Sequence, residues 1–146
     1  MTSALRSFAG LLPAAAWVAI ILGASLFAHP SDVLPSGFRI WDKALHAAAF
    51  AVFGLLAAGG LDHAVRWRAP ATHLALLTTL LAFGLGCLDE FIQWHRPSRT
   101  AEWGDVIADT VGGLLGAMTF LILRDLSRRL RRNPPHDSTA GTPPLR

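Results

Sequence analysis

The sequence is poor in charged residues, has a single cysteine and lacks several common catalytic motifs, and each absence narrows the class of protein. Charged residues make up 16% of the 146 positions, whereas ordinary soluble domains have about 25%. A small soluble domain is therefore a poor description of this chain. Cys87 is the only cysteine, which excludes an intramolecular disulfide. The sequence contains no glycine-rich phosphate loop, no Ser-His-Asp order in a catalytic context and no internal repeat.

Hydrophobic residues make up 52% of the chain and gather in four long runs that carry almost no charge. A helix needs about 20 apolar residues to cross the hydrocarbon core of a bilayer, which is about 30 Å thick. Backbone groups in hydrocarbon must be hydrogen-bonded internally, and nothing here resembles a barrel strand. The runs therefore predict an all-α, polytopic membrane protein, a four-transmembrane-helix bundle. Its helices are expected over about residues 8–28, 42–61, 70–93 and 104–124.

The first run, residues 8–28, has a second interpretation as a cleaved signal peptide. Arg6 would be its charged start and Ser25 to Ala28 its cleavage region. The apolar core of a signal peptide is only about 7 to 15 residues long, and Leu26 is a poor residue for a cleavage box. The length of the run favours retention as a membrane helix.

The distribution of Lys and Arg predicts how the bundle is oriented, because short loops rich in these residues stay cytoplasmic. With four spans, one face holds both termini and the loop at residues 62–70. That face carries Arg6, Arg66, Arg68, Arg124, Arg128, Arg129, Arg131 and Arg132, and the other carries Arg39, Lys43, Arg96 and Arg99. We therefore expect cytoplasmic N- and C-termini and an outward-facing opposite end.

Three short polar strings lie at the ends of the apolar segments on the predicted outer side. The first is Asp42-Lys43-x-x-His46, the second Asp89-Glu90-x-x-Gln93, and the third is Arg99 followed by Asp105 and Asp109. Alternating spans bring the start of the second helix, the end of the third and the start of the fourth together. Within each string two polar residues are four apart, which places them on one helix face. The predicted functional cluster is Asp42, Lys43, His46, Asp89, Glu90, Gln93, Arg99, Asp105 and Asp109.

Asp109 is the unusual member of this cluster. Asp105 can be explained as an N-terminal residue that satisfies free backbone N–H groups of its helix. Asp109 lies one turn deeper, about 6 Å further along the helix, and an acid facing lipid costs about 2.5 kcal/mol or more at mid-bilayer. Asp109 should therefore face the bundle, and His46, at a matching depth, is its natural partner.

In this order and spacing, the strings resemble the VanZ-like family, named for a teicoplanin-resistance protein. The resemblance extends from Trp41 to Gly116, and includes Pro97-Ser98-Arg99 and the run from Asp105 to Asp109 that leads into Gly112-Gly113. The family pattern has asparagine where this chain has Asp109. The resemblance implies a protein of the bacterial cell envelope, hence of the bacterial plasma (inner) membrane, related to glycopeptide resistance. It supplies no reaction, so whether the protein is an enzyme stays open.

Three hypotheses for the cluster remain open. In the first, it binds or modifies a lipid-linked or cell-wall anionic molecule, with Lys43 and Arg99 meeting the anion and Asp, Glu and His groups orienting polar moieties or acting as acid and base. In the second, the protein is a non-enzymatic scaffold or accessory protein whose polar cluster is structural. No residue is assigned a catalytic role.

The third hypothesis is a divalent-metal-dependent membrane enzyme. Asp89, Glu90, Asp105 and Asp109 offer hard oxygen ligands for Mg²⁺ or Ca²⁺, and His46 and His95 offer nitrogen. The residues have no known ligand spacing, and Lys43 and Arg99 would repel a cation. No cofactor and no metal ligand are therefore predicted, with a divalent cation kept as the alternative.

The remaining features concern partners and the tail. The transmembrane domain is expected to cover residues 1–126, followed by a basic, proline-rich and disordered cytoplasmic tail at 127–146. Arg128 to Arg132 would attract anionic lipid headgroups, at about 1 kcal/mol each. Without a folded domain beside these arginines, no nucleic-acid partner is expected. Gly112 and Gly116 permit close helix contact, either within the bundle or in a homo-oligomer.

Overall fold

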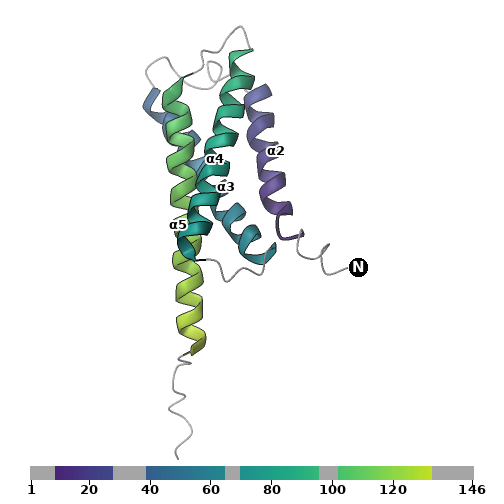
Figure 1. Cartoon of the computed structure of the whole chain (residues 1–146). Helices are drawn as coiled ribbons and strands as arrows, with labels where there is room; N and C mark the ends of the chain where they lie inside the picture. Colours follow the sequence, from purple (N-terminus) through teal and green to yellow (C-terminus); the bar gives the residue numbers. More distant parts are fainter. Residues whose placement is uncertain (1–8, 28–38, 65–69, 96–101, 133–146) are drawn as a thin grey trace, which may run out of the picture.

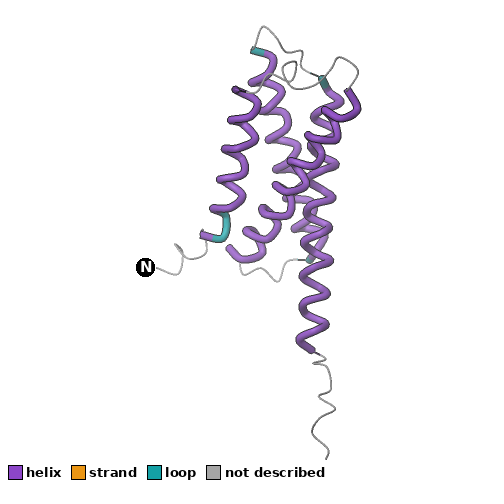
Figure 2. Tube along the Cα trace, turned by 180° about the vertical axis from the view of Figure 1, so that it is seen from behind, coloured by secondary structure: helices purple, strands orange, loops and turns teal. Residues whose placement is uncertain are grey.

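The computed structural model describes residues 9–27, 39–64, 70–95 and 102–132, and these residues form four helices (Figure 1). The helices are α2 (Leu12–Phe27), α3 (Arg39–Ala64), α4 (Ala71–Trp94) and α5 (Trp103–Arg132). They alternate in direction along the chain, so that α3 and α5 run parallel to each other and antiparallel to α2 and α4 (Figures 1 and 2). The start of α3, the end of α4 and the start of α5 therefore meet at one end of the bundle. This arrangement agrees with the all-α prediction.

Three of the helices are long and apolar enough to cross a membrane, namely α3 from Asp42, α4 and α5. Between 28% and 33% of the most apolar window of each is buried inside the protein. Leucine, isoleucine and phenylalanine side chains on their outer faces, such as Leu80, Phe83 and Ile122, are exposed. Helix α2 is shorter, with 16 residues, or about 24 Å at 1.5 Å per residue.

The closest packing in the bundle is between α3 and α5. A Cβ atom at Gly112 would meet the backbone of Ala47, and one at Gly116 would meet the backbone of Ala51 and Leu55. Only glycine permits two helix backbones to approach this closely. Gly112 and Gly116 were expected to permit close helix contact either within the bundle or in a homo-oligomer. The structure shows the contact within the bundle. A homo-oligomer that used the same glycines would have to displace α3.

Helix α2 packs beside α3 and α4. Its Ala14 and Ile21 join a buried apolar cluster with Phe50 and Phe53 of α3. The indole Nε1 of Trp17 donates a hydrogen bond of 2.8 Å to the backbone oxygen of Ala49. This contact anchors α2 to the middle of α3, because Trp17 satisfies its polar atom while its ring fills the interface.

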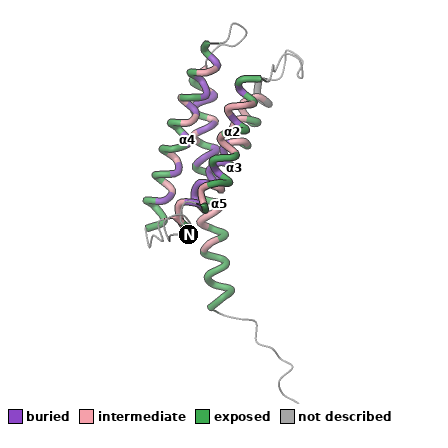
Figure 3. The backbone as a smooth tube through the Cα atoms, turned by 90° about the vertical axis from the view of Figure 1, so that its right-hand side faces the viewer, coloured by how far each residue is buried: buried purple, intermediate pink, exposed green. Residues whose placement is uncertain are grey.

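The helix boundaries differ from the predicted ones mainly at the end of α5. Disorder was expected from residue 127, but α5 continues to Arg132 and projects beyond the other helices, with its side chains exposed (Figure 3). Arginine and leucine are good helix formers, and Arg129 Nε donates to Asp125 Oδ2 at 2.7 Å, four residues away, which stabilises the exposed turn. The predicted tail at 133–146 lies outside the described residues.

The close glycine contact between α3 and α5 predicts that a larger residue there will lower the free energy of unfolding. Replacing Gly116→Ala should destabilise the fold by about 1–3 kcal/mol, because the new methyl group is forced into the backbone of α3. The measurement is the thermal midpoint of the detergent-solubilised protein, followed by far-ultraviolet circular dichroism.

The matched control is Gly84→Ala in α4, where an added Cβ atom meets nothing within 4 Å. This variant should keep the midpoint or raise it slightly, since alanine is the better helix former by about 1 kcal/mol. Equal midpoints for the two variants would contradict the close contact.

Candidate functional site

The polar strings converge where α3 begins, α4 ends and α5 begins, at the upper end of the bundle in Figure 1. Eight of the nine predicted residues belong to the described part of the chain, and Arg99 lies outside it. The eight do not form a single site. Six of them divide into an ion-pair group near the end of the bundle, a buried group one turn deeper, and Glu90, which faces a pocket. Of the other two, Gln93 donates a hydrogen bond to Asp89 and Asp42 comes close to His46 and Asp105.

The ion-pair group consists of Lys43, Glu102 and Asp105. Lys43 Nζ lies 2.6 Å from Asp105 Oδ1 and 3.1 Å from Glu102 Oε2. The Lys43 side chain is 39% exposed and that of Asp105 only 8%, so the contact is partly shielded from solvent. Lys43 is thus held by two carboxylates and ties α3 to the start of α5. The predicted cluster did not include Glu102, which precedes α5 and has no helical spacing to mark it.

The buried group consists of His46, Asp89 and Asp109, one from each of α3, α4 and α5. His46 Nδ1 lies 3.1 Å from Asp109 Oδ1, which confirms the predicted pairing. The Asp109 side chain is fully buried. A Cβ atom at Gly86 would lie 2.9 Å from Asp109 Oδ2, so the glycine leaves room for this carboxylate against α4.

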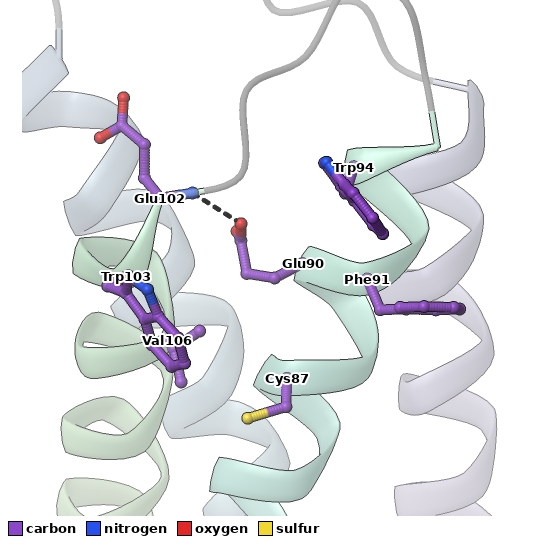
Figure 4. Close-up of a pocket in the computed structure, with 7 residues that line it drawn as sticks. All are labelled: Cys87, Glu90, Phe91, Trp94, Glu102, Trp103 and Val106. Atoms are coloured by element: carbon purple, nitrogen blue, oxygen red, sulfur yellow. Dashed lines mark hydrogen bonds between the residues drawn. The ribbon is translucent and has the colours of Figure 1, made fainter.

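Asp89 and Glu90 are adjacent in sequence and face different surroundings, as expected for neighbours about 100° apart on a helix. Asp89 Oδ2 accepts a 2.8 Å hydrogen bond from Gln93 Nε2 inside the bundle. Glu90 Oε2 accepts a 2.8 Å hydrogen bond from the backbone N–H of Glu102 (Figure 4). Asp89 therefore belongs to the buried group, whereas Glu90 binds the backbone of Glu102, the residue that directly precedes α5.

Several buried oxygen atoms at this end have no hydrogen-bond partner among the described residues. They are Asp89 Oδ1, Glu90 Oε1 and Asp109 Oδ2, with Thr78 Oγ1 in the middle of α4. Leaving such an acceptor unpaired costs about 1–3 kcal/mol, and more when it is charged. Among the described residues, these buried oxygens therefore outnumber the donors that reach them, and a donor or a cation that enters the bundle would satisfy them.

A pocket of about 300 Å³ opens between α4 and α5 beside Glu90. Figure 4 shows the Glu90 carboxylate between the two helices, with the indole of Trp103 on α5 and the phenyl ring of Phe91 and the indole of Trp94 on α4. Trp94 is 68% and Trp103 79% exposed. The pocket is lined by Cys87, Glu90, Phe91, Trp94, Glu102, Trp103 and Val106.

Two of the considered residues are members of none of these groups. Asp42 is partly exposed, and one of its oxygens comes within 4.8 Å of ligand atoms of His46 and Asp105. His95 is exposed, and its Nδ1 lies 2.8 Å from the backbone oxygen of Phe91. Its ring packs against Phe91 at the end of α4, with centroids 4.6 Å apart. His95 therefore joins no cluster of candidate metal ligands in the described part of the chain.

The fold and the site together describe an all-helical, membrane-type protein with a polar cluster at one end of its apolar helices. The sequence profile of the VanZ/LLP1 family matches residues 3–124, which include every residue of the three groups. The chain belongs to the VanZ/LLP1 family. Searches of curated proteins and of solved structures give no match.

The partly shielded pair of Lys43 and Asp105 can be measured by a double-mutant cycle. Combining Lys43→Met with Asp105→Asn should give a coupling energy of about 1–2 kcal/mol, because the contact is partly shielded from solvent and Lys43→Met leaves the Asp105 carboxylate without its cation. The measurement is the free energy of unfolding of the wild type, both single variants and the double variant in detergent.

The control is the exposed pair of Asp125 and Arg129, whose side chains are 60% and 77% exposed. The same cycle with Asp125→Asn and Arg129→Met should give only about 0.3–0.5 kcal/mol. A coupling no larger at Lys43 and Asp105 would show that their contact adds nothing to stability.

Proposed function

We propose that this VanZ-family chain spans the bacterial plasma membrane four times and binds a lipid-linked envelope molecule at its outer face. In this topology α2 is the first span and both termini are cytoplasmic. Support comes from the packing of α2 against α3 through Trp17 and from the described start of α2, which lies at the same end of the bundle as the end of α3 (Figure 1).

The charges on α5 support this orientation. Its last turns carry Arg128, Arg129, Arg131 and Arg132 beyond the bundle, all exposed. In the proposed topology these arginines meet the anionic headgroups of the cytoplasmic leaflet, each contributing about 1 kcal/mol. The acidic end of the bundle then faces outward, which follows the positive-inside rule.

The topology is testable with single cysteines in a Cys87→Ala background. Ser98→Cys should react with a membrane-impermeant maleimide in intact cells, whereas Ser3→Cys and Ser138→Cys should react only after the cells are permeabilised. The readout is the mass shift of the labelled protein. Labelling of Ser3→Cys from outside would show that α2 does not cross the membrane, and labelling of Ser138→Cys from outside would reverse the orientation.

The observation that carries the binding proposal is Glu90, which lines a pocket with mostly apolar walls and whose buried Oε1 has no hydrogen-bond partner among the described residues. The other oxygen of Glu90 already accepts the Glu102 N–H, so the free one is held in place as an acceptor. The Phe91, Trp94 and Trp103 rings suit the interfacial region of a bilayer. A lipid-linked molecule fits this combination, since its chain lies along the rings and a hydroxyl or ammonium group of its head donates to Glu90.

The anionic part of such a molecule would meet a different residue. Lys43 is engaged by Glu102 and Asp105, and a second anion there would have to compete with two carboxylates. Arg99 is the remaining candidate from the predicted cluster, because its guanidinium can bind a phosphate with two parallel hydrogen bonds. These contacts support binding, and they define no bond that is made or broken.

Glu90→Gln tests the proposal. The amide oxygen can still accept the Glu102 N–H, while an NH₂ group replaces the free acceptor, so the fold should persist and the ligand contact should be lost. We expect the variant to insert at wild-type abundance and to lose any teicoplanin resistance that the wild type confers. The amount of lipid that co-purifies with it, identified by mass spectrometry, should be at least about tenfold lower than for the wild type.

Asp125→Asn is the matched control, because it removes an exposed carboxylate far from the pocket. It should keep both the phenotype and the bound lipid. A Glu90→Gln variant that is abundant and retains both would rule out ligand binding through Glu90.

A structural scaffold is the second candidate function. It is favoured by the contacts of Lys43 and His46 with α5, which join the two helices without any ligand. If the protein is a scaffold, substitutions in the cluster reduce the amount of folded protein, and the phenotype weakens only in proportion to that reduction. Abundance, measured by size-exclusion chromatography of the detergent extract, separates the two candidates.

A further inference from the structure

We propose that His46, Asp89 and Asp109 form a binding site for a divalent transition-metal ion in the interior of the bundle. Each of the three helices α3, α4 and α5 supplies one residue, and the candidate ligand atoms all lie within 4.8 Å of one another. This site is separate from the Glu90 pocket, and the proposal does not depend on a lipid ligand.

The spacing of the ligand atoms suits a metal ion. His46 Nδ1 and Asp109 Oδ1 are 3.1 Å apart. Two atoms that are each about 2.1 Å from one ion lie about 3.0–3.4 Å apart at octahedral or tetrahedral angles. An ion can therefore replace the hydrogen bond between these side chains with little movement of either, releasing the proton that the hydrogen bond uses.

Unpaired oxygen atoms supply the second argument. Asp89 is 1% and Asp109 0% exposed, and each uses one carboxylate oxygen, Asp89 toward Gln93 and Asp109 toward His46. The other oxygens, Asp89 Oδ1 and Asp109 Oδ2, have no hydrogen-bond partner among the described residues. A buried carboxylate oxygen without a hydrogen-bond donor is costly and requires an explanation, and a bound cation is one.

Charge supplies the third argument. The buried group contains two carboxylates and one imidazole, and Lys43 at the same end of α3 is already bound to Glu102 and Asp105. An uncompensated charge inside a bundle destabilises it strongly. A divalent ion balances both carboxylates and fills their free acceptor positions at the same time.

The ligand types identify the class of metal. One imidazole nitrogen with two carboxylate oxygens suits Mn²⁺, Fe²⁺ or Zn²⁺, whereas Mg²⁺ and Ca²⁺ prefer oxygen alone. Gln93 holds Asp89 through a hydrogen bond, as residues behind metal ligands commonly do. Asp42 and Asp105 also come close to His46, but Asp105 binds the Lys43 ammonium, which disfavours a cation there.

The test measures metal binding by the full chain, purified in detergent through a tag without histidine and stripped with a chelator. Mn²⁺ binding is followed by the loss of the free-ion signal in electron paramagnetic resonance, and Zn²⁺ by elemental analysis after desalting. The wild type should bind one ion per chain. Asp109→Asn, Asp89→Asn and His46→Gln should each weaken binding by at least about tenfold.

The controls carry the same chemical changes at exposed positions. Asp125→Asn and His95→Gln should bind the ion like the wild type, because neither residue belongs to the buried group. The helical content and elution volume of every variant are measured in parallel, so that a loss of fold is not mistaken for a loss of ligand.

Two results would overturn the proposal. In the first, the wild-type protein binds neither Mn²⁺ nor Zn²⁺. This result is obtained without any variant and would show that protons balance the two carboxylates. The other is folded variants of the buried group that bind as tightly as the wild type, which would place the ion elsewhere. Neither result bears on the Glu90 pocket, whose lipid is measured separately.

Discussion

The structure depends most on the glycine-mediated contact between α3 and α5. These helices run parallel, and the contacts of Gly112 with Ala47 and of Gly116 with Ala51 fix their register. The same register pairs Lys43 with Asp105, His46 with Asp109 and, at the far end, Asp62 with Arg124 at 2.6 Å. Polar pairs at both ends therefore enclose a tightly packed apolar middle, and a shift of one turn would break all of them together.

The two levels of polar residues at the acidic end differ in how well they are satisfied. The ion-pair group around Lys43 contains a cation for its carboxylates and is partly exposed. The buried group, one turn deeper, has two carboxylates, and one oxygen of each has no hydrogen-bond partner among the described residues. A deeper position raises the energetic cost of every unpaired acceptor, so the buried group depends more strongly on what else binds there.

Much of the fold followed from the sequence, because apolar runs about as long as a bilayer is thick have few alternatives to helices. The pairing of His46 with Asp109 followed from their depth. The separation of the cluster into groups did not follow from the sequence. Residue spacing within one helix does not show how that helix is rotated about its own axis relative to its neighbour. Glu102 was missed because it precedes α5, and the extension of α5 was missed because its arginines interrupt the apolar run.

Because α5 is one continuous helix, its length fixes the distance between its polar residues at the two surfaces of the membrane. From Arg124 to Gly104, the ends of the predicted span, the helix rises about 30 Å at 1.5 Å per residue, which is the thickness of the hydrocarbon core. In the proposed topology, the arginines beyond Arg124 lie among the inner headgroups, and Asp109 then lies about one and a half turns inside the outer hydrocarbon boundary. A thicker or thinner membrane would move the acidic end relative to the outer headgroups, which couples the depth of the site to bilayer thickness.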